Sequence, residues 1–111
     1  MKLLVQSLVL LSQLMVTLSS VQAQNMDNGK VLYTKCVSCH GRGGEGNKSQ
    51  KAPMIGGQYD WYLESQIKNI RDKKRVNANT PKMHPFVKDL SDKEIKDLSA
   101  YVQTLSWQPQ Q

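Results

Sequence analysis

Both cysteines of the 111-residue chain lie within five positions, in the stretch "CVSCH" at residues 36–40. Two residues separate Cys36 from Cys39, and His40, one of two histidines, follows directly. Residues three and four positions apart lie on the same face of a helix. On a helical turn the two thiols and the imidazole would therefore point to one side, where they could act on a single bound group.

Three kinds of site use cysteines and histidines at such spacing. A structural zinc site built from these three side chains lacks a fourth ligand, and His84 is the one histidine left to supply it. A thioredoxin-like disulfide requires a βαβ scaffold and gives no role to His40. The C-x-x-C-H pattern is typical of covalent haem attachment, with two sulfurs for thioether bonds and an imidazole for the iron. Five residues can match by chance, so the rest of the sequence has to decide.

Residues 1–23 have the composition of a secretory signal peptide. Lys2 precedes an apolar stretch, and the segment ends in small residues at Ala23. We expect cleavage after Ala23, which leaves residues 24–111 as one exported domain. An uncleaved anchor is the alternative, but the apolar run is interrupted by polar residues and is shorter than the roughly 20 residues that a spanning helix needs. We therefore expect no stable membrane insertion.

Export bears on the chemistry of the two cysteines, because exported thiols ordinarily form disulfides. A bridge between Cys36 and Cys39 would close almost no loop and would stabilise little. Covalent haem attachment would use both thiols, so it accounts better than a disulfide for two cysteines at this spacing in an exported protein.

Composition and charge narrow the class of protein further. The net charge of the chain is +6 at pH 7, and loss of Lys2 with the signal segment leaves +5. The chain has a single phenylalanine, so a large flat apolar cofactor would complete a modest core. A positive charge suits an acidic partner or an anionic surface. Nucleic-acid binding is not expected, because the basic and aromatic pattern of the known modules is missing.

Apolar periodicity predicts three helices and no strand, so the expected class is all-α. Asp27 or Asn28 would cap a first helix that continues through residues 29–40 and stops at Gly41. The second helix would start near Asp60, and the third would begin with a capping box. The expected apolar stripes are Trp61, Leu63, Ile67 and Ile70 in the second helix and Ile95, Leu98, Val102 and Leu105 in the third, after the box of Ser91 and Glu94.

Two irregular stretches separate the helices. Residues 41–57 contain six of the seven glycines, and residues 72–90 contain Met83 and His84. Loops of this length inside a small domain are usually functional.

Taken together, these segments resemble a small bacterial class I cytochrome c of the periplasmic electron-carrier type. The likeness covers nearly all of residues 26–106. It consists of "GKVLYTKCVSCHG", "APMIGGQ", "YLESQIKNIR", a methionine in the loop that follows, and a last helix that carries Tyr101. Five pieces in this order are more specific than one pentapeptide.

The resemblance implies a class I cytochrome c fold around one covalently bound haem c. Cys36 and Cys39 would form the thioether bonds, and His40 and Met83 would be the proximal and distal iron ligands. His84 directly follows Met83 and is the alternative distal ligand. The resemblance further implies that the Pro53 carbonyl accepts a hydrogen bond from the His40 ring. It also implies that the first and last helices cross near Gly29 and Tyr101.

The implied function is one-electron transfer in the periplasm, without enzyme activity. The alternatives are a haem subunit of a larger oxidoreductase complex and a gas-binding haem protein, which needs an open sixth position on the iron. Redox proteins with an acidic docking surface are the expected partners, recognised by Lys82 and Lys88 beside Met83. Arg71, Lys73, Lys74 and Arg75 would extend the same positive field or simply form a solvated face.

Four further side chains have expected places in this fold. Met54 is expected in the core. The expected core or pocket walls are Trp61, Tyr62 and Tyr101.

Overall fold

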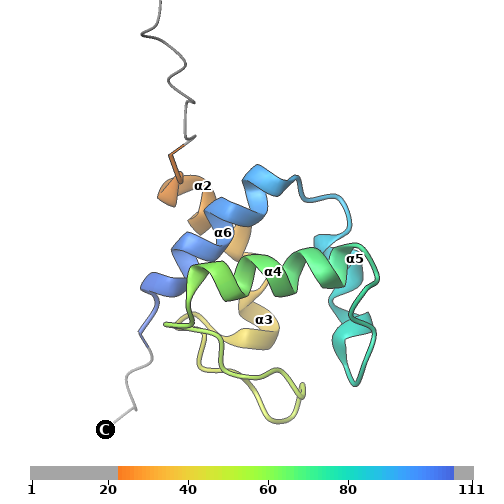
Figure 1. The fold of residues 1–111 in the computed structure, drawn as a ribbon. Helices are drawn as coiled ribbons and strands as arrows, with labels where there is room; N and C mark the ends of the chain where they lie inside the picture. The colour runs from red at the N-terminus through yellow and green to blue at the C-terminus, as the bar shows by residue number, and fades with distance from the viewer. Residues whose placement is uncertain (1–22, 107–111) are drawn as a thin grey trace, which may run out of the picture.

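A computed structural model describes residues 23–106, so the expected signal peptide lies outside the described residues except for Ala23. The described part is helical, and its one β feature is an isolated bridge between Asn47 and Ala52. The helices, shown in Figure 1, are α2 (Met26–Tyr33), α3 (Val37–His40), α4 (Asp60–Arg71), the 3-10 helix η1 (Thr80–Lys82), α5 (His84–Val87) and α6 (Asp92–Thr104). The all-α prediction is confirmed. Within residues 23–106, no helix has both the length and the apolar character to cross a membrane.

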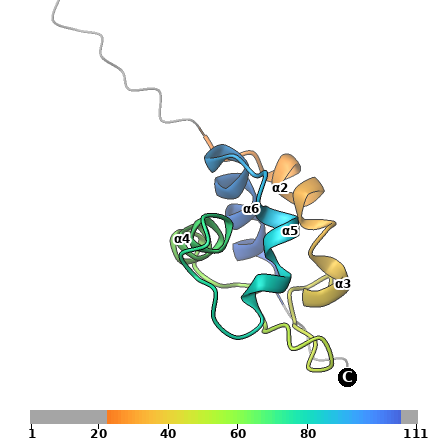
Figure 2. The ribbon, with the colours of Figure 1, turned by 90° about the vertical axis from the view of Figure 1, so that its right-hand side faces the viewer.

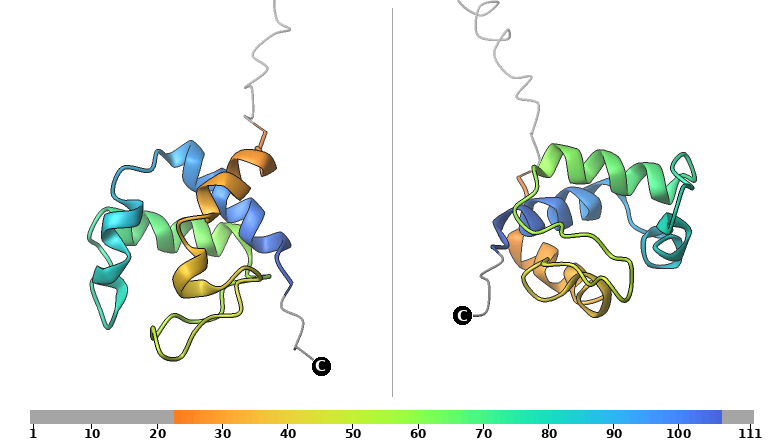
Figure 3. Two further views of the ribbon diagram at one scale, coloured as in Figure 1. Left: turned by 180° about the vertical axis from the view of Figure 1, so that it is seen from behind. Right: turned by 90° about the horizontal axis from the view of Figure 1, so that it is seen from below.

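Helix α6 is the centre of the fold, with α4 on one side of it and α2 and α3 on the other (Figure 2). Apolar residues at helical spacing face each other across α4 and α6. The buried members are Leu63, Ile67 and Ile70 of α4 and Ile95, Leu98 and Val102 of α6, together with Tyr33 and Val87. Most members of the two stripes predicted from the sequence therefore form the core, and Figure 3 shows α4 and α6 side by side from below.

Helices α2 and α6 cross at Gly29, as the resemblance implies. A Cβ atom on Gly29 would lie 2.2 Å from the Asp97 carbonyl oxygen and 2.7 Å from Tyr101 Cβ. Any side chain at this position would push the helices apart, since real Cβ atoms do not approach other heavy atoms so closely. The glycine thus permits the close approach of α2 and α6.

The first helix differs from its predicted course in its cap and its length. Asn25 is the N-cap, and its side chain accepts a hydrogen bond from the Asn28 backbone N–H at 3.0 Å. The helix then breaks after Tyr33, and α3 starts at Val37. Thr34 contributes to the break because its hydroxyl donates to the Val31 carbonyl at 2.7 Å, in competition with the helical backbone pattern. The end of α3 at Gly41 agrees with the prediction.

Two other expectations are wrong in detail. Trp61 is 66% exposed, because it lies two residues before Leu63 and each residue turns the helix by about 100°. It therefore points away from the apolar stripe. The segment 72–90 is also less irregular than expected, since it contains η1 and α5. The capping box at the start of α6 is confirmed by two hydrogen bonds, from Glu94 N to Ser91 Oγ at 3.1 Å and from Ser91 N to Glu94 Oε2 at 2.8 Å.

Candidate functional site

Helix α3 is a single turn that brings the C-x-x-C-H residues together. The His40 backbone N–H donates to the Cys36 carbonyl at 2.8 Å, so the first cysteine and the histidine lie one turn apart. Both cysteines are free and half-buried, and His40 is 5% exposed. Cys36 also packs against the buried core cluster. The contact between Cys36 and the core cluster thus fixes the position of α3 in the domain.

Tyr33 links the C-terminal end of α3 to α2 and α6. Its hydroxyl donates to the Gly41 carbonyl at 2.6 Å, and its ring lies 5.7 Å from that of Tyr101. Burial raises the pKa of Tyr33 to about 12, with smaller contributions from Cys36, Glu45 and Tyr101. The hydroxyl therefore remains a donor throughout the neutral range. Sequence reasoning missed this contact, because it joins residues eight positions apart across a helix break.

The thiol chemistry argues against a redox disulfide. Burial, with a smaller contribution from the neighbouring Cys39, raises the pKa of Cys36 to about 11. Reactive C-x-x-C thiols have a lowered pKa, because the thiolate is the nucleophile. Among residues 23–106, no group of three or more His, Cys, Asp and Glu side chains is arranged to hold a metal ion.

The glycine-rich loop 41–57 folds back on α3 and fixes the orientation of the His40 ring. Nδ1 of His40 donates to the Pro53 carbonyl at 2.9 Å, as the resemblance implies. A carbonyl oxygen can only accept, so Nδ1 carries a proton, and in the neutral ring the lone pair then lies on Nε2. Such a hydrogen bond is typical of histidines that bind a metal through the opposite nitrogen.

Gly46 allows the loop to reach this position. Its φ is +82°, and its backbone N–H donates to the His40 carbonyl at 2.8 Å. A Cβ atom there would lie 2.7 Å from Met54 N and 2.8 Å from the Pro53 carbonyl carbon. Only glycine combines this conformation with such close contact to the proline.

Met83 lies between η1 and α5, on the segment that follows α4. Its backbone N–H donates to the Thr80 carbonyl at 2.9 Å, and its carbonyl accepts from Phe86 N at the same distance. The side chain is half-buried and packs against the core cluster, as Cys36 does. His84 turns elsewhere, because its Nε2 donates to the Arg71 carbonyl at 3.2 Å.

The structure corrects two expectations for other large side chains. Met54 is 60% exposed, so its expected place in the core is wrong. Trp61 is a surface residue that stacks on Tyr59, with ring centroids 5.9 Å apart. Tyr62 meets Trp61 edge-on, while Tyr101 packs against the core as expected.

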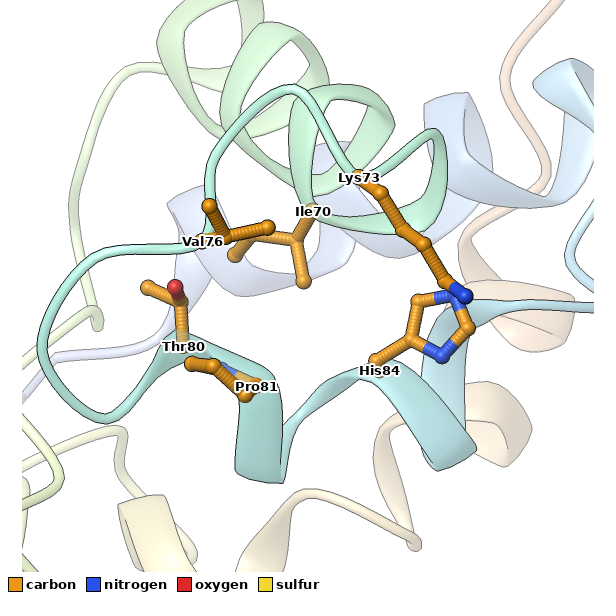
Figure 4. A pocket seen from close by; sticks show the side chains of 6 residues that line it. All are labelled: Ile70, Lys73, Val76, Thr80, Pro81 and His84. Atoms are coloured by element: carbon orange, nitrogen blue, oxygen red, sulfur yellow. The ribbon is translucent and has the colours of Figure 1, made fainter.

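A separate pocket of about 180 Å³ lies at the C-terminal end of α4 (Figure 4). Its lining consists of Ile70, Lys73, Val76, Thr80, Pro81 and His84. It contains neither the C-x-x-C-H residues nor Met83, so it is distinct from the site on α3.

The residues on α3 fit a covalently attached haem. Two free thiols lie one turn apart, beside a buried imidazole whose Nδ1 is already hydrogen-bonded and whose Nε2 can bind iron. A helical domain with this arrangement defines a c-type haem protein. The chain belongs to the cytochrome c family, whose family model, described as Cytochrome c, matches residues 26–106.

Several known cytochromes resemble this chain. It is 44% identical to cytochrome c-554(548) of Halomonas halodenitrificans over 66 residues, which are 60% of this chain and 78% of the relative. It is 37% identical to cytochrome c4 of Stutzerimonas stutzeri over 71 residues, which are 63% of this chain and 34% of the relative.

A solved structure shows the same fold. Reduced recombinant cytochrome c4 from Pseudomonas stutzeri superimposes with a TM-score of 0.68 and 31% sequence identity. The match covers 73% of this chain and 48% of that chain. The chain thus spans about half the length of the solved relative.

Family membership confirms several predictions. The chain is a cytochrome c electron carrier and not an enzyme, its cofactor is covalently bound haem c with iron, and its partners are redox proteins.

Proposed function

We propose that the chain is a periplasmic one-electron carrier in which Cys36 and Cys39 form the thioether bonds to the haem. His40 and Met83 are the proximal and distal iron ligands. The hydrogen bond from His40 Nδ1 to the Pro53 carbonyl, 2.9 Å long, carries this proposal, because it fixes the ring with Nε2 free for the metal. When bound, haem c supplies a one-electron change between Fe(III) and Fe(II).

Met83 is the better distal ligand for two reasons. Its side chain packs against the same buried cluster as Cys36, whereas the His84 Nε2 is occupied by the Arg71 carbonyl at 3.2 Å. A thioether is soft and neutral and favours the ferrous state, so a Met/His pair raises the reduction potential. If His40 and Met83 both bind the iron, as proposed, no position would be left open for a gas molecule.

The first described contacts of the chain support a mature protein that starts at Gln24. Gln24 Nε2 donates to Asp60 Oδ2 at 3.2 Å, and Asn25 caps α2. Gln24 and Asn25 therefore already belong to the folded domain, and the proposed exported domain is residues 24–111.

The test is a comparison of variants of the exported protein. Wild type should keep haem stain on a denaturing gel, and its intact mass should be that of residues 24–111 plus one haem. Cys36→Ala and Cys39→Ala should weaken or abolish the stain. A wild-type protein without stain would overturn the proposal.

Optical spectra then assign the distal ligand. Met83→Ala should abolish the weak long-wavelength sulfur-to-iron band of the oxidised protein and lower its potential, because the soft ligand is lost. His84→Ala is the matched control and should retain the band. The reverse pattern would assign the position to His84.

A surface around Lys82 is the proposed docking site for an acidic redox partner. Lys82 is exposed and, within the part of the chain that the structure describes, makes no ion pair. Lys88 pairs with Asp89 at 2.6 Å, and Arg71 pairs with Asp72 and Asp92. Of Lys82, Lys88 and Arg71, Lys82 is therefore the one whose charge no carboxylate of the described residues offsets, and it lies next to Met83.

A further inference from the structure

Arg71 is the last residue of α4. It contacts the segment 83–92, which carries Met83, near both of its ends. Its Nη1 donates to the Leu90 carbonyl at 3.0 Å and to Asp92 Oδ1 at 2.7 Å. Its own carbonyl accepts from His84 Nε2 at 3.2 Å. One residue thus holds the segment 83–92 just after its start and again at its end.

We propose that Arg71 is a positioning residue that clamps the segment 83–92 onto α4 and thereby controls how firmly Met83 is held. The inference rests on the proposed role of Met83 as distal ligand. Figure 4 shows the His84 ring directed toward the end of α4, beside Lys73. Two attachments, one and seven residues after the proposed ligand, limit its movement more than either does alone.

The guanidinium suits this position because it presents several donors in a fixed plane. One edge pairs with Asp72, through Nε to Oδ1 at 2.8 Å and Nη2 to Oδ2 at 3.3 Å. The remaining donor, Nη1, is left for Leu90 and Asp92. Hydrogen bonds to Asp72 and Asp92 raise the pKa of Arg71, and they lower the pKa of both carboxyl groups.

The bond to the Leu90 carbonyl distinguishes this arrangement from an ordinary surface ion pair. Exposed ion pairs stabilise proteins little. The Arg71 side chain is only 17% exposed, and its bond to Leu90 ties α4 to the backbone that precedes α6. Asp72 shares the same guanidinium but lies outside the segment 83–92, so it provides a matched control.

Two measurements on Arg71→Gln, Arg71→Lys and Asp72→Asn test the clamp in the haem-loaded protein. The first is titration of the oxidised protein with imidazole, which must displace the distal side chain to bind the iron. Arg71→Gln should bind imidazole about tenfold more tightly than wild type, since loss of one hydrogen bond to a charged group changes an equilibrium by about that factor. Arg71→Lys should be intermediate, and Asp72→Asn should stay within about twofold of wild type.

The second measurement is amide hydrogen exchange. The N–H groups of Phe86, Lys88 and Leu90 are bonded within the segment, to Met83, His84 and Val87. These three N–H groups should exchange faster in Arg71→Gln than in wild type. The exchange rate of the Gly29 N–H in α2, which donates to the Asn25 carbonyl, should not change. Equal imidazole affinity and equal exchange in Arg71→Gln and Asp72→Asn would overturn the clamp.

The two proposals can fail separately. If wild type lacks the sulfur-to-iron band, the role of Met83 is wrong, and the exchange of Phe86, Lys88 and Leu90 still decides whether Arg71 holds the segment.

Discussion

At the scale of single residues, the orientation of His40 depends on a proline carbonyl and on a glycine that contacts it. Gly46 has positive φ and lies against Pro53, whose carbonyl accepts from His40 Nδ1. The imidazole is thus positioned by backbone groups, which move less than side chains. A change in Gly46 should therefore act on His40, the proposed iron ligand, through the backbone.

We predict that Gly46→Ala destabilises the protein by about 2 to 3 kcal/mol, through strain at positive φ and contact with the backbone of Pro53. Gly57→Ala is the control, because its φ is +77° but its nearest neighbour would be Leu105 O at 3.4 Å. Strain alone should cost Gly57→Ala only about 1 kcal/mol. Thermal unfolding of both variants measures the difference, and equal losses would show that the contact with Pro53 does not matter.

The residues of the candidate site differ in how well the sequence predicts them. The C-x-x-C-H chemistry is local, so type and spacing identify Cys36, Cys39 and His40. Arg71 looked like part of a charged surface in the sequence, because its contacts with Leu90 and Asp92 join residues about twenty positions apart. Such contacts have no local signature.

At the scale of elements, a buried carboxylate holds α2 against α6. Asp97 is 1% exposed, and its oxygens accept from Asn25 N at 2.8 Å, from Asn28 Nδ2 at 3.0 Å and from Lys93 Nζ. Burial raises the pKa of Asp97, but the hydrogen bonds from Lys93, Asn25 and Asn28 outweigh it, and the net shift is downward. The charged form is thus favoured in the folded protein.

We predict that Asp97→Asn lowers the free energy of unfolding at pH 7 by about 2 kcal/mol. A lowered folded-state pKa gives stability that is fully present above the unfolded-state value of about 3.9 and is lost as the pH falls through the folded-state pKa. The difference from wild type should therefore narrow below about pH 4. Denaturant unfolding between pH 3 and pH 7 measures it, with Asp89→Asn as an exposed control.

A difference between wild type and Asp97→Asn that stays constant down to pH 3 would contradict the role of the charge. In that case, the loss would come from the shape of the side chain alone.

The helices were predictable where an apolar stripe or a cap defines them. The stripes of α4 and α6 and the capping box of Ser91 and Glu94 are periodic local patterns, and the structure confirms them. The break after Tyr33 was not predicted, because it depends on Thr34 bonding to Val31 and on the anchor between Tyr33 and Gly41. Helix α5 had a signal, since proline favours the first turn of a helix and Pro85 lies in its first turn.

At the scale of the whole molecule, only part of the positive charge is free to attract an anionic partner. The net charge of the chain is +6, but several basic groups are paired with carboxylates in the described residues. Charge that is already paired contributes little to the field that a partner meets. Location, rather than net charge, should then set the rate of encounter with an anionic partner.

We predict that Lys82→Glu slows oxidation of the reduced protein by hexacyanoferrate(III), an anionic acceptor, about threefold at 10 mM ionic strength. Lys88→Glu should have a smaller effect, because Asp89 offsets its charge at 2.6 Å. Lys30→Glu, on α2, changes the net charge equally and should leave the rate within about 1.5-fold. Stopped-flow kinetics measure all three, with reduction potentials recorded to exclude a change in driving force.

Salt provides the decisive comparison for this surface. The Debye length falls from about 30 Å at 10 mM to about 3 Å at 1 M, so the rates of wild type and Lys82→Glu should converge as salt is added. If Lys82→Glu and Lys30→Glu slow the reaction equally, only the net charge matters. If neither variant nor salt changes the rate, the acceptor approaches the haem across an uncharged face, and the proposed docking site around Lys82 is wrong.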